Sequence, residues 1–361
     1  VGRWWLDGAV TMPDPTGKPI NLALQGGGSH GAFTWGVLDA LLERGTLNIE
    51  GISGTSAGAM NAVVLADGFE EGGIDGARHH LEHFWRSVSK ASSFSPIQRT
   101  LLSMLFGSWS MDKSPGYVMS DVISRFYSPY DFNPLNLNPL REILEDLVDF
   151  ERVRRCKGVQ LFLGATNVFN GKVRVFETKE ITADSVMASA CLPYMFQAVE
   201  IDGIPYWDGG YMGNPVLFPF FRKTATDDIL LVQINPIERR EIPKSAREIL
   251  NRVNEITFNA SLLRELRAIE FVSRKLKEGV LSPDEYSDIR MHRIALVDTD
   301  APLSASSKVN AEWKFLTYLR DLGRDAAHQW CEENEQHVGK TSTLRLNEEI
   351  AYTMRGELTG F

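Results

Sequence analysis

The chain has 361 residues, of which 43% are hydrophobic and 24% charged, and its formal net charge at pH 7 is −9. This composition is typical of a folded globular protein and excludes a disordered chain. The acidic balance argues against a nucleic-acid partner and against adsorption to anionic lipid through a polybasic patch. The three cysteines lie far apart, so no disulfide framework or paired-cysteine zinc site is predicted, and no secretory signal is visible. We therefore expect a cytoplasmic protein.

The first part of the chain alternates strands, glycine turns and helices. Buried strands are predicted over residues 21–25 and 49–53, and each leads through a glycine-rich turn into a helix, over 29–43 and 59–66 respectively. This alternation is typical of βαβ units on a parallel sheet.

Further elements follow along the chain. Four strands are predicted, at 159–165, 173–177, 229–234 and 294–297, together with four helices, at 77–88, 140–147, 246–278 and 309–334. The last two helices carry many charge pairs at i,i+4 spacing, which is typical of helices that face solvent.

Residues 93–141 differ in composition from the rest of the chain. They are rich in aromatic and aliphatic residues, contain several prolines and carry four basic and three acidic residues, for a net charge of +1. The segment is predicted to be an apolar, irregular insertion. It could form a lid or an acyl-chain wall over the site and make transient contact with a membrane surface. The alternative is that it simply adds to the core.

The second glycine turn, Gly54-x-Ser56-x-Gly58, matches the nucleophile elbow of serine hydrolases. In such an elbow a sharp strand-to-helix turn strains the central residue and lifts its hydroxyl clear of the sheet, above a helix N-terminus that favours developing negative charge. The alternative is an ordinary helix start at which the Ser56 side chain caps the first turn.

The first glycine turn, Gly26-Gly27-Gly28-Ser29-His30-Gly31, allows two interpretations. As G-x-G-x-x-G it fits a dinucleotide-binding fingerprint, but that function also needs an acidic residue at the end of the second strand, where the sequence has Gly54-Thr55-Ser56. As an oxyanion hole it would present unhindered backbone N–H groups to an ester oxygen. Two neighbouring turns, one with a serine and one with bare amides, favour a hydrolase.

A serine nucleophile needs a base, and none of the histidines far downstream of Ser56, His292, His328 and His337, lies in a convincing glycine- or turn-bounded loop. The sequence Asp208-Gly209-Gly210 is more suggestive, because an acid followed by two glycines can form a tight turn that holds a carboxylate beside a strand end. The alternative is that Asp208 belongs to an Asp-Gly hairpin turn.

These motifs together resemble the patatin-like phospholipases, serine acyl hydrolases with a Ser–Asp dyad. The matching blocks are the glycine loop with Gly31, the Gly54–Gly58 elbow, Ala188-Ser189-Ala190-Cys191-Leu192-Pro193 with Phe196, and Asp208-Gly209-Gly210, and they span about residues 19–235. The resemblance implies that Ser56 is the nucleophile and Asp208 the base. It also implies an oxyanion hole in the Gly26, Gly27 and Gly28 loop, chiefly from the last two amides.

One residue departs from the family pattern. Family members often carry Arg or Lys where this chain has His30. An imidazole there would give weaker and pH-dependent stabilisation. Packing at the helix start is the expected role of His30, with proton movement as the alternative.

The resemblance further implies a three-layer α/β sandwich with a mainly parallel central sheet flanked by helices. We expect residues 1–18 to form an N-terminal tail, 19–240 the catalytic domain and 241–361 a mainly helical part packed on it. The expected function is hydrolysis of lipid or other acyl esters without a metal or cofactor. A nucleotide-binding oxidoreductase using Gly26–Gly31 and a non-enzymatic lipid-binding protein remain as alternatives.

A second motif points to metal chemistry. His79-His80-Leu81-Glu82-His83 fits the H-x-x-E-H pattern of some zinc peptidases, with His79 and His83 one helical turn apart. Because the buried stripe of that helix is formed by other residues, we interpret the two histidines as part of a solvated face and predict no metal site.

Overall fold

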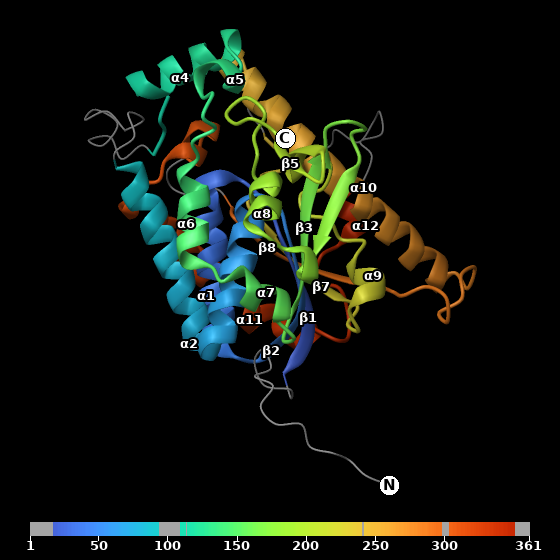
Figure 1. Ribbon diagram of the computed structural model, residues 1–361. Helices are drawn as coiled ribbons and strands as arrows, with labels where there is room; N and C mark the ends of the chain where they lie inside the picture. The colour runs from blue at the N-terminus through green and yellow to red at the C-terminus, as the bar shows by residue number, and fades with distance from the viewer. Residues whose placement is uncertain (1–16, 94–108, 113, 240–241, 298–302, 351–361) are drawn as a thin grey trace.

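The computed structural model describes residues 17–93, 109–112, 114–239, 242–297 and 303–350. Most of the predicted tail at 1–18 and residues 94–108 of the predicted insertion therefore lie outside the described residues. Helices cover both faces of one central sheet, which confirms the predicted three-layer α/β fold (Figure 1). The first strand begins at Lys18, so the end of the predicted tail already belongs to the sheet.

Eight described strands form the sheet, with β5-β6-β3-β2-β1-β7-β8 as its order and β4 paired to β3. Five of them are mutually parallel: β1 Lys18–Leu24, β2 Leu47–Gly54, β3 Gln160–Asn167, β7 Asp228–Gln233 and β8 Arg290–Ala295. The others pair antiparallel beside β3: β4 Val173–Glu177, β5 Val199–Ile201 and β6 Ile204–Asp208. The carboxyl ends of the parallel strands thus lie at one edge of the sheet.

Alternating strand residues build a core on each face of the sheet. Leu22 and Leu24 of β1 are buried with α1 (Gly31–Arg44), α2 (Ala57–Ser92) and α11 (Trp313–Asn334). Ala23, between them, is buried in a second cluster together with Leu262 and Leu266 of α10 (Ala246–Lys277). Successive side chains of a strand point to opposite faces, so both clusters follow from the continuous apolar run of β1.

Shorter helices complete the layers. On the side of α1 and α2 lie α6 Pro139–Leu147, α7 Phe150–Arg155 and α8 Ala183–Ser189, whereas α9 Phe220–Lys223 and α12 Leu346–Glu349 lie on the side of α10 (Figure 1). Local signals set several of the helix starts. Ser245 and Glu248 form a capping box at the start of α10, and the side chain of Asn138 accepts a hydrogen bond at the start of α6.

The strand predicted at 294–297 is wrong in position, because β8 runs from Arg290 to Ala295. Its polar residues obscure the strand pattern in the sequence. Arg290 and His292 both bind the carboxylate of Asp228 on the neighbouring strand, at 2.7 and 3.0 Å, so their polar groups are satisfied inside the sheet.

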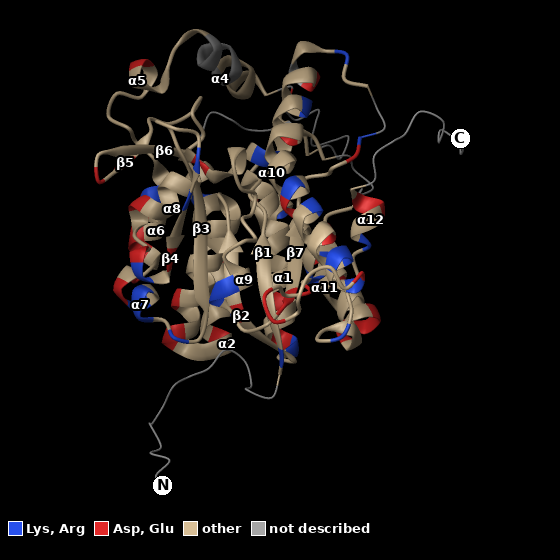
Figure 2. Cartoon of the chain, turned by 90° about the vertical axis from the view of Figure 1, so that its right-hand side faces the viewer, with Lys and Arg blue, Asp and Glu red and all other residues tan. Residues whose placement is uncertain are grey.

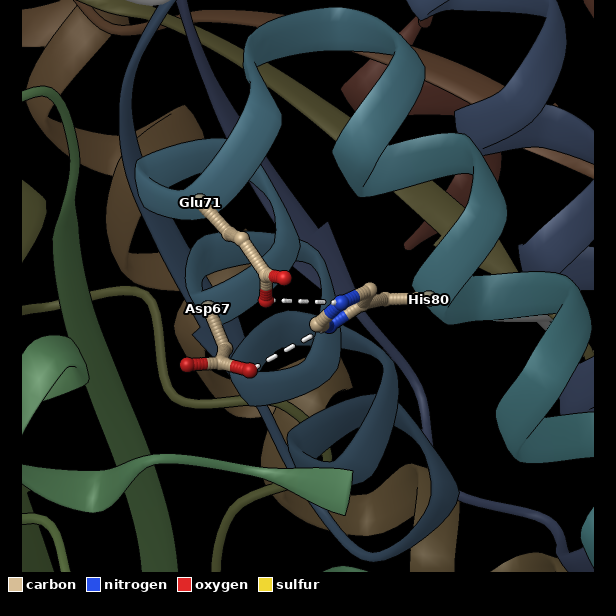
Figure 3. A group of neighbouring side chains, drawn as sticks. All are labelled: Asp67, Glu71 and His80. Carbon is tan, nitrogen blue, oxygen red and sulfur yellow. Dashed lines mark ion pairs between the residues drawn. The ribbon is translucent and has the colours of Figure 1, made fainter.

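The helices predicted separately at 59–66 and 77–88 are two halves of α2, which breaks at Gly72 and Gly73. Asp67 and Glu71 lie on the first half and His80 on the second, and the two ring nitrogens of His80 face the two carboxylates at 3.2 and 3.1 Å (Figure 3). These contacts join the two halves of the helix across the break.

The predicted insertion is more regular than expected. Within it, residues Pro115–Phe126 form α4 and Pro129–Phe132 form α5, both beyond the carboxyl edge of the sheet (Figure 1). The expectation of an irregular segment is therefore wrong for this part. Among the described residues, no helix is both long enough and apolar enough to cross a bilayer.

Candidate active site

Ser56 occupies the sharp turn between β2 and α2. Its backbone has φ 54° and ψ −121°, a conformation that L-residues rarely adopt, and its side chain makes no capping hydrogen bond to the helix. The N-cap alternative is therefore wrong, and the strained elbow expected from Gly54-x-Ser56-x-Gly58 is present. The two glycines permit the turn, since a Cβ on Gly54 would lie 2.6 Å from the carbonyl oxygen of Gly58. Helix α8 supports it from outside through the Ser189 hydroxyl, which accepts a hydrogen bond from the Ser56 N–H at 3.0 Å.

Asp208 ends β6, close to Ser56 in the sheet. Strand β3 lies between β2 and β6, and it pairs Leu163 with Gly54 on one side and Ala165 with Asp208 on the other. The Asp-Gly hairpin turn lies elsewhere, at Asp202-Gly203 between β5 and β6, where both residues have positive φ. The hairpin alternative for Asp208 is thus wrong.

The Asp208 carboxylate is buried, with 1% of the residue exposed. Its Oδ1 accepts a hydrogen bond from the Gly210 N–H at 2.7 Å, whereas its Oδ2 has no hydrogen-bond partner within the described part of the chain. Burial raises the pKa of Asp208 to about 6, and the Gly210 amide and the Ser56 hydroxyl lower this pKa only in part. The sheet thus brings together a strained serine and a carboxylate that accepts a proton more readily than an exposed one.

The glycine loop at the end of β1 passes directly beside Ser56. A Cβ on Gly26 would lie 2.6 Å from the Ser56 Cβ, so this position has no room for a side chain. The Gly26 N–H donates to Asn214 Oδ1 at 2.7 Å, and the Gly26 carbonyl accepts from Asn235 Nδ2 at 2.6 Å. The expectation that Gly26 belongs to the oxyanion donors is therefore corrected, because its N–H is already engaged.

The same two contacts orient the next amide. In a trans peptide the carbonyl of one residue and the N–H of the next point in opposite directions, so the Gly27 N–H points away from Asn235. Within the described residues, neither Gly27 N–H nor Gly28 N–H has a hydrogen-bond acceptor. These two amides remain free to donate to a bound ligand.

Sequence reasoning missed both asparagines that hold this loop. Asn214 follows the Asp208 turn, and Asn235 follows β7, far from the glycine loop in the sequence. Both immediately precede a proline, at Asn214-Pro215 and Asn235-Pro236, which marks a turn but not its partner. Gln25 adds a third contact, since its Oε1 accepts from the N–H of Asn235 at 2.9 Å.

His30 is buried and its Nε2 lies 2.8 Å from the Ser307 hydroxyl, while its ring packs edge-on against Phe315. Burial holds the pKa of His30 well below its usual value, and the charges of Lys308 and Arg239 lower it further. The contacts support packing at the helix start. A cation reaches the loop from elsewhere, because the Lys308 ammonium donates to Asn235 Oδ1 at 2.7 Å.

Neither histidine of the H-x-x-E-H motif belongs to the cluster with metal-ligand geometry. His79 and His83 stack on each other with ring centroids 6.1 Å apart. Among the described residues, the group with that geometry is Asp67, Glu71 and His80 at the break in α2 (Figure 3). Arg152 on α7 already binds both carboxylates there, at 2.7 Å from Asp67 and 2.8 Å from Glu71. This arrangement is that of an ion-pair cluster whose cation is a guanidinium.

The remaining site glycines pack tightly around Asp208. A Cβ on Gly209 would lie 2.1 Å from the Gly164 carbonyl oxygen, and one on Gly210 would lie 3.0 Å from the Phe258 ring. Gly31 is equally confined, 2.6 Å from the Ala57 Cβ by the same measure. The structure thus brings together the glycine loop, the Ser56 elbow and the Asp208 turn.

Comparisons with known proteins identify the family of the chain. The model of the patatin-like phospholipase family matches residues 22–221. Among solved structures, the chain is similar to VipD from Legionella pneumophila, with 17% identity, a TM-score of 0.37, and coverage of 86% of this chain and 68% of VipD. It is also similar to a chain of the heterodimeric ExoU–SpcU complex from the type III secretion system of Pseudomonas aeruginosa. The identity there is 17% and the TM-score 0.36, and the match covers 90% of this chain but 53% of that chain. None of the curated proteins matches the chain. With a family match over more than half of its length, the chain belongs to the patatin-like phospholipase family.

Proposed function

We propose that the protein is a serine-dependent lipid acyl hydrolase of the phospholipase A, lysophospholipase or carboxylesterase type. The Ser56 Oγ attacks the carbonyl carbon of an acyl ester and gives its proton to Asp208. The Gly27 and Gly28 amides donate hydrogen bonds to the resulting oxyanion, and the proton leaves with the departing alcohol or lysolipid.

Water completes the cycle. It attacks the acyl-enzyme on Ser56 while Asp208 accepts one of its protons, and the fatty acid leaves as the proton returns to Ser56. Residues 19–240 supply these catalytic groups. Among the described residues after 241, β8 extends the same sheet and α11 covers α1, which supports a C-terminal part packed on the catalytic domain.

One observation carries the proposal: a serine in a strained strand-to-helix turn lies beside a buried carboxylate whose pKa is about 6. A helix N-cap has no need of such strain. An aspartate with a purely structural role has no need of a raised pKa, because burial of its charged form costs free energy without stabilising the fold.

Hydrolysis by matched variants tests the proposal. Ser56→Ala is expected to lose hydrolysis of both short-chain esters and phospholipids, by on the order of 10⁴-fold or more. Ser189→Ala, which removes a neighbouring hydroxyl that only supports the turn, is expected to retain a substantial part of it. Equal activity of Ser56→Ala and the wild type would refute the assignment.

The alternatives predict other outcomes. A non-enzymatic lipid-binding protein would bind lipid without any turnover that depends on Ser56. A nucleotide-binding oxidoreductase would show a nucleotide-dependent rise in melting temperature. A chain-length series on synthetic esters and phospholipids would then define the substrate. We further propose a cytoplasmic location with transient contact between the insertion at 93–141 and a membrane surface.

A further inference from the structure

Large apolar side chains protrude from the end of α4 and from the region around α5 that follows it. Phe126 and Leu135 are each 79% exposed, and Leu137 and Tyr130 are 64% and 58% exposed. They lie around α5, beyond the carboxyl edge of the sheet where Ser56 and Asp208 are found (Figure 1). Soluble proteins rarely gather so many exposed apolar groups without a partner.

This region is joined to the site itself. The Ala198 N–H donates to the Tyr130 hydroxyl at 3.3 Å, and Gln197 Nε2 donates to the Asn133 carbonyl at 2.9 Å. The segment that they hold begins at Cys191, whose carbonyl accepts the Asp208 N–H at 2.7 Å. It carries another exposed aromatic residue, Tyr194, at 66% exposure.

The first turns of α10 flank the site on another side. Phe258 faces the site, with its ring 5.1 Å from that of Tyr211. Exposed apolar residues lie on the outer side of the same turns: Ile249, Leu250, Val253 and Ile256, all 44–54% exposed. Both ribbon views place this end of α10 beside the same edge of the sheet as α4 and α5 (Figures 1 and 2).

The loops of this surface carry almost no charge, and the first turns of α10 carry charges of both signs, Glu248, Arg252 and Glu255. Asp131 is the one charged residue in the sequence from 126 to 138, and residues 191–199 and 209–221 contain none. Figure 2 shows the loop around α5 almost without acidic or basic residues. With a net charge of −9 on the whole chain, this face matches an uncharged or zwitterionic surface better than an anionic one.

We propose that these exposed residues around α5, Tyr194 and the first turns of α10 form a docking face for a zwitterionic lipid surface, such as a phosphatidylcholine bilayer. The face places the mouth of the site against the lipid, so that an acyl chain reaches Ser56 without crossing water. This inference rests on the proposed function for its substrate, but lipid binding by the face is measured independently of hydrolysis.

Cosedimentation with vesicles tests the proposal. The Ser56→Ala protein, which cannot turn over lipid, is expected to bind phosphatidylcholine vesicles, with little change when anionic lipid is added or salt is raised. Replacing Leu135, Leu137 and Tyr194 together by Ser is expected to weaken binding by about 100-fold, because three large apolar groups no longer leave water. A second variant, Ile249→Ser with Val253→Ser, is expected to weaken it as well.

The other end of α10 offers a matched control. Phe271 and Val280 are 51% and 66% exposed but lie at and just beyond the distal end of the helix. Their replacement by Ser is expected to leave vesicle binding within about twofold of the parent protein. Circular dichroism and melting curves establish that each variant is folded.

The inference would be overturned if the parent protein did not bind phosphatidylcholine, or if binding required anionic lipid and disappeared in salt. It would also be overturned if the distal control lost as much vesicle binding as the face variants. A face buried in a dimer that the variants dissociate would overturn it as well. Vesicle binding by a protein that hydrolyses no ester would contradict the proposed function alone. Hydrolysis of esters without vesicle binding would contradict the docking face alone.

Discussion

The pH dependence of ester hydrolysis follows from the environment of Asp208. Because burial raises the pKa of this carboxyl to about 6, the base that accepts the Ser56 proton is lost by protonation at mildly acidic pH. We therefore expect kcat/KM for a soluble short-chain ester to rise with pH along a single-proton limb with an apparent pKa of about 6.

The size of the effect separates a buried base from an exposed one. With a pKa of about 6, roughly a tenth of Asp208 is ionised at pH 5 and roughly nine-tenths at pH 7. An aspartate with an unshifted pKa would be more than about nine-tenths ionised at pH 5. Initial rates at pH 5 and pH 7.5 should thus differ about tenfold, after a control incubation shows that the enzyme survives pH 5.

Protein stability should respond in the opposite direction to activity. The pKa of Asp208 is higher in the folded than in the unfolded state, so folding favours the protonated form, and stability falls as pH rises between about 4 and 6. Above that range the buried charge costs up to about 3 kcal/mol. Asp208→Asn is therefore expected to lose hydrolysis and yet to be at least as stable as the wild type at pH 8.

Two results would refute this reasoning. A rate that stays flat down to pH 4.5 would show that no group with a pKa near 6 acts as the base. An Asp208→Asn variant that keeps full ester hydrolysis would show that the proton goes elsewhere.

Three further changes test the surroundings of the site. Asn235→Ala, or Lys308→Met beside it, should loosen the glycine loop and lower kcat by about 10- to 100-fold with little change in KM. Steady-state kinetics measures both constants, and an unchanged kcat would contradict the role of Asn235 in holding the loop. Asp228→Asn should lower the free energy of unfolding by about 2 kcal/mol at pH 7, because His292 and Arg290 hold the pKa of this aspartate at about 2 against the opposing effect of burial. The stability difference between variant and wild type should vanish as pH falls toward 2. Chemical denaturation at a series of pH values measures this difference. Arg152→Ala should cost about 3 kcal/mol by leaving the buried Asp67 without its guanidinium, and melting curves that match the wild type would contradict this ion-pair cluster.

The sequence predicted the fold and its family because glycine turns next to apolar runs are local signals. The elbow at Ser56 and the turn at Asp208 each occupy a few consecutive residues; each motif alone allowed another interpretation, and the four blocks together carried the resemblance that assigned them. What brings the two side chains together is their shared neighbour β3, and the pairing of distant strands leaves no local trace.

The hydrogen bonds that hold the glycine loop were not predictable for the same reason. Gly26 meets Asn214 and Asn235, which lie about 190 and 210 residues further along the chain. The contact with Asn214 also explains why Gly26 is not an oxyanion donor, since a single N–H serves one acceptor here. A glycine motif specifies a loop without side chains, but tertiary contacts decide which of its amides stay free.

Polar residues in buried positions account for another error. Arg290 and His292 make β8 look like a solvated segment, and only their pairing with Asp228 reconciles them with the sheet. A pattern based on hydrophobicity cannot anticipate such pairing, because each residue taken alone favours water.

Labelling with a fluorophosphonate tests the central claim, that Ser56 is an activated nucleophile, most directly. Peptide mapping by mass spectrometry should find one phosphonyl adduct, on Ser56, in the wild-type protein and none in Ser56→Ala. Labelling of the wild type should slow at pH 5 as Asp208 becomes protonated. An adduct on another serine, or equal labelling of Ser56→Ala, would contradict the account.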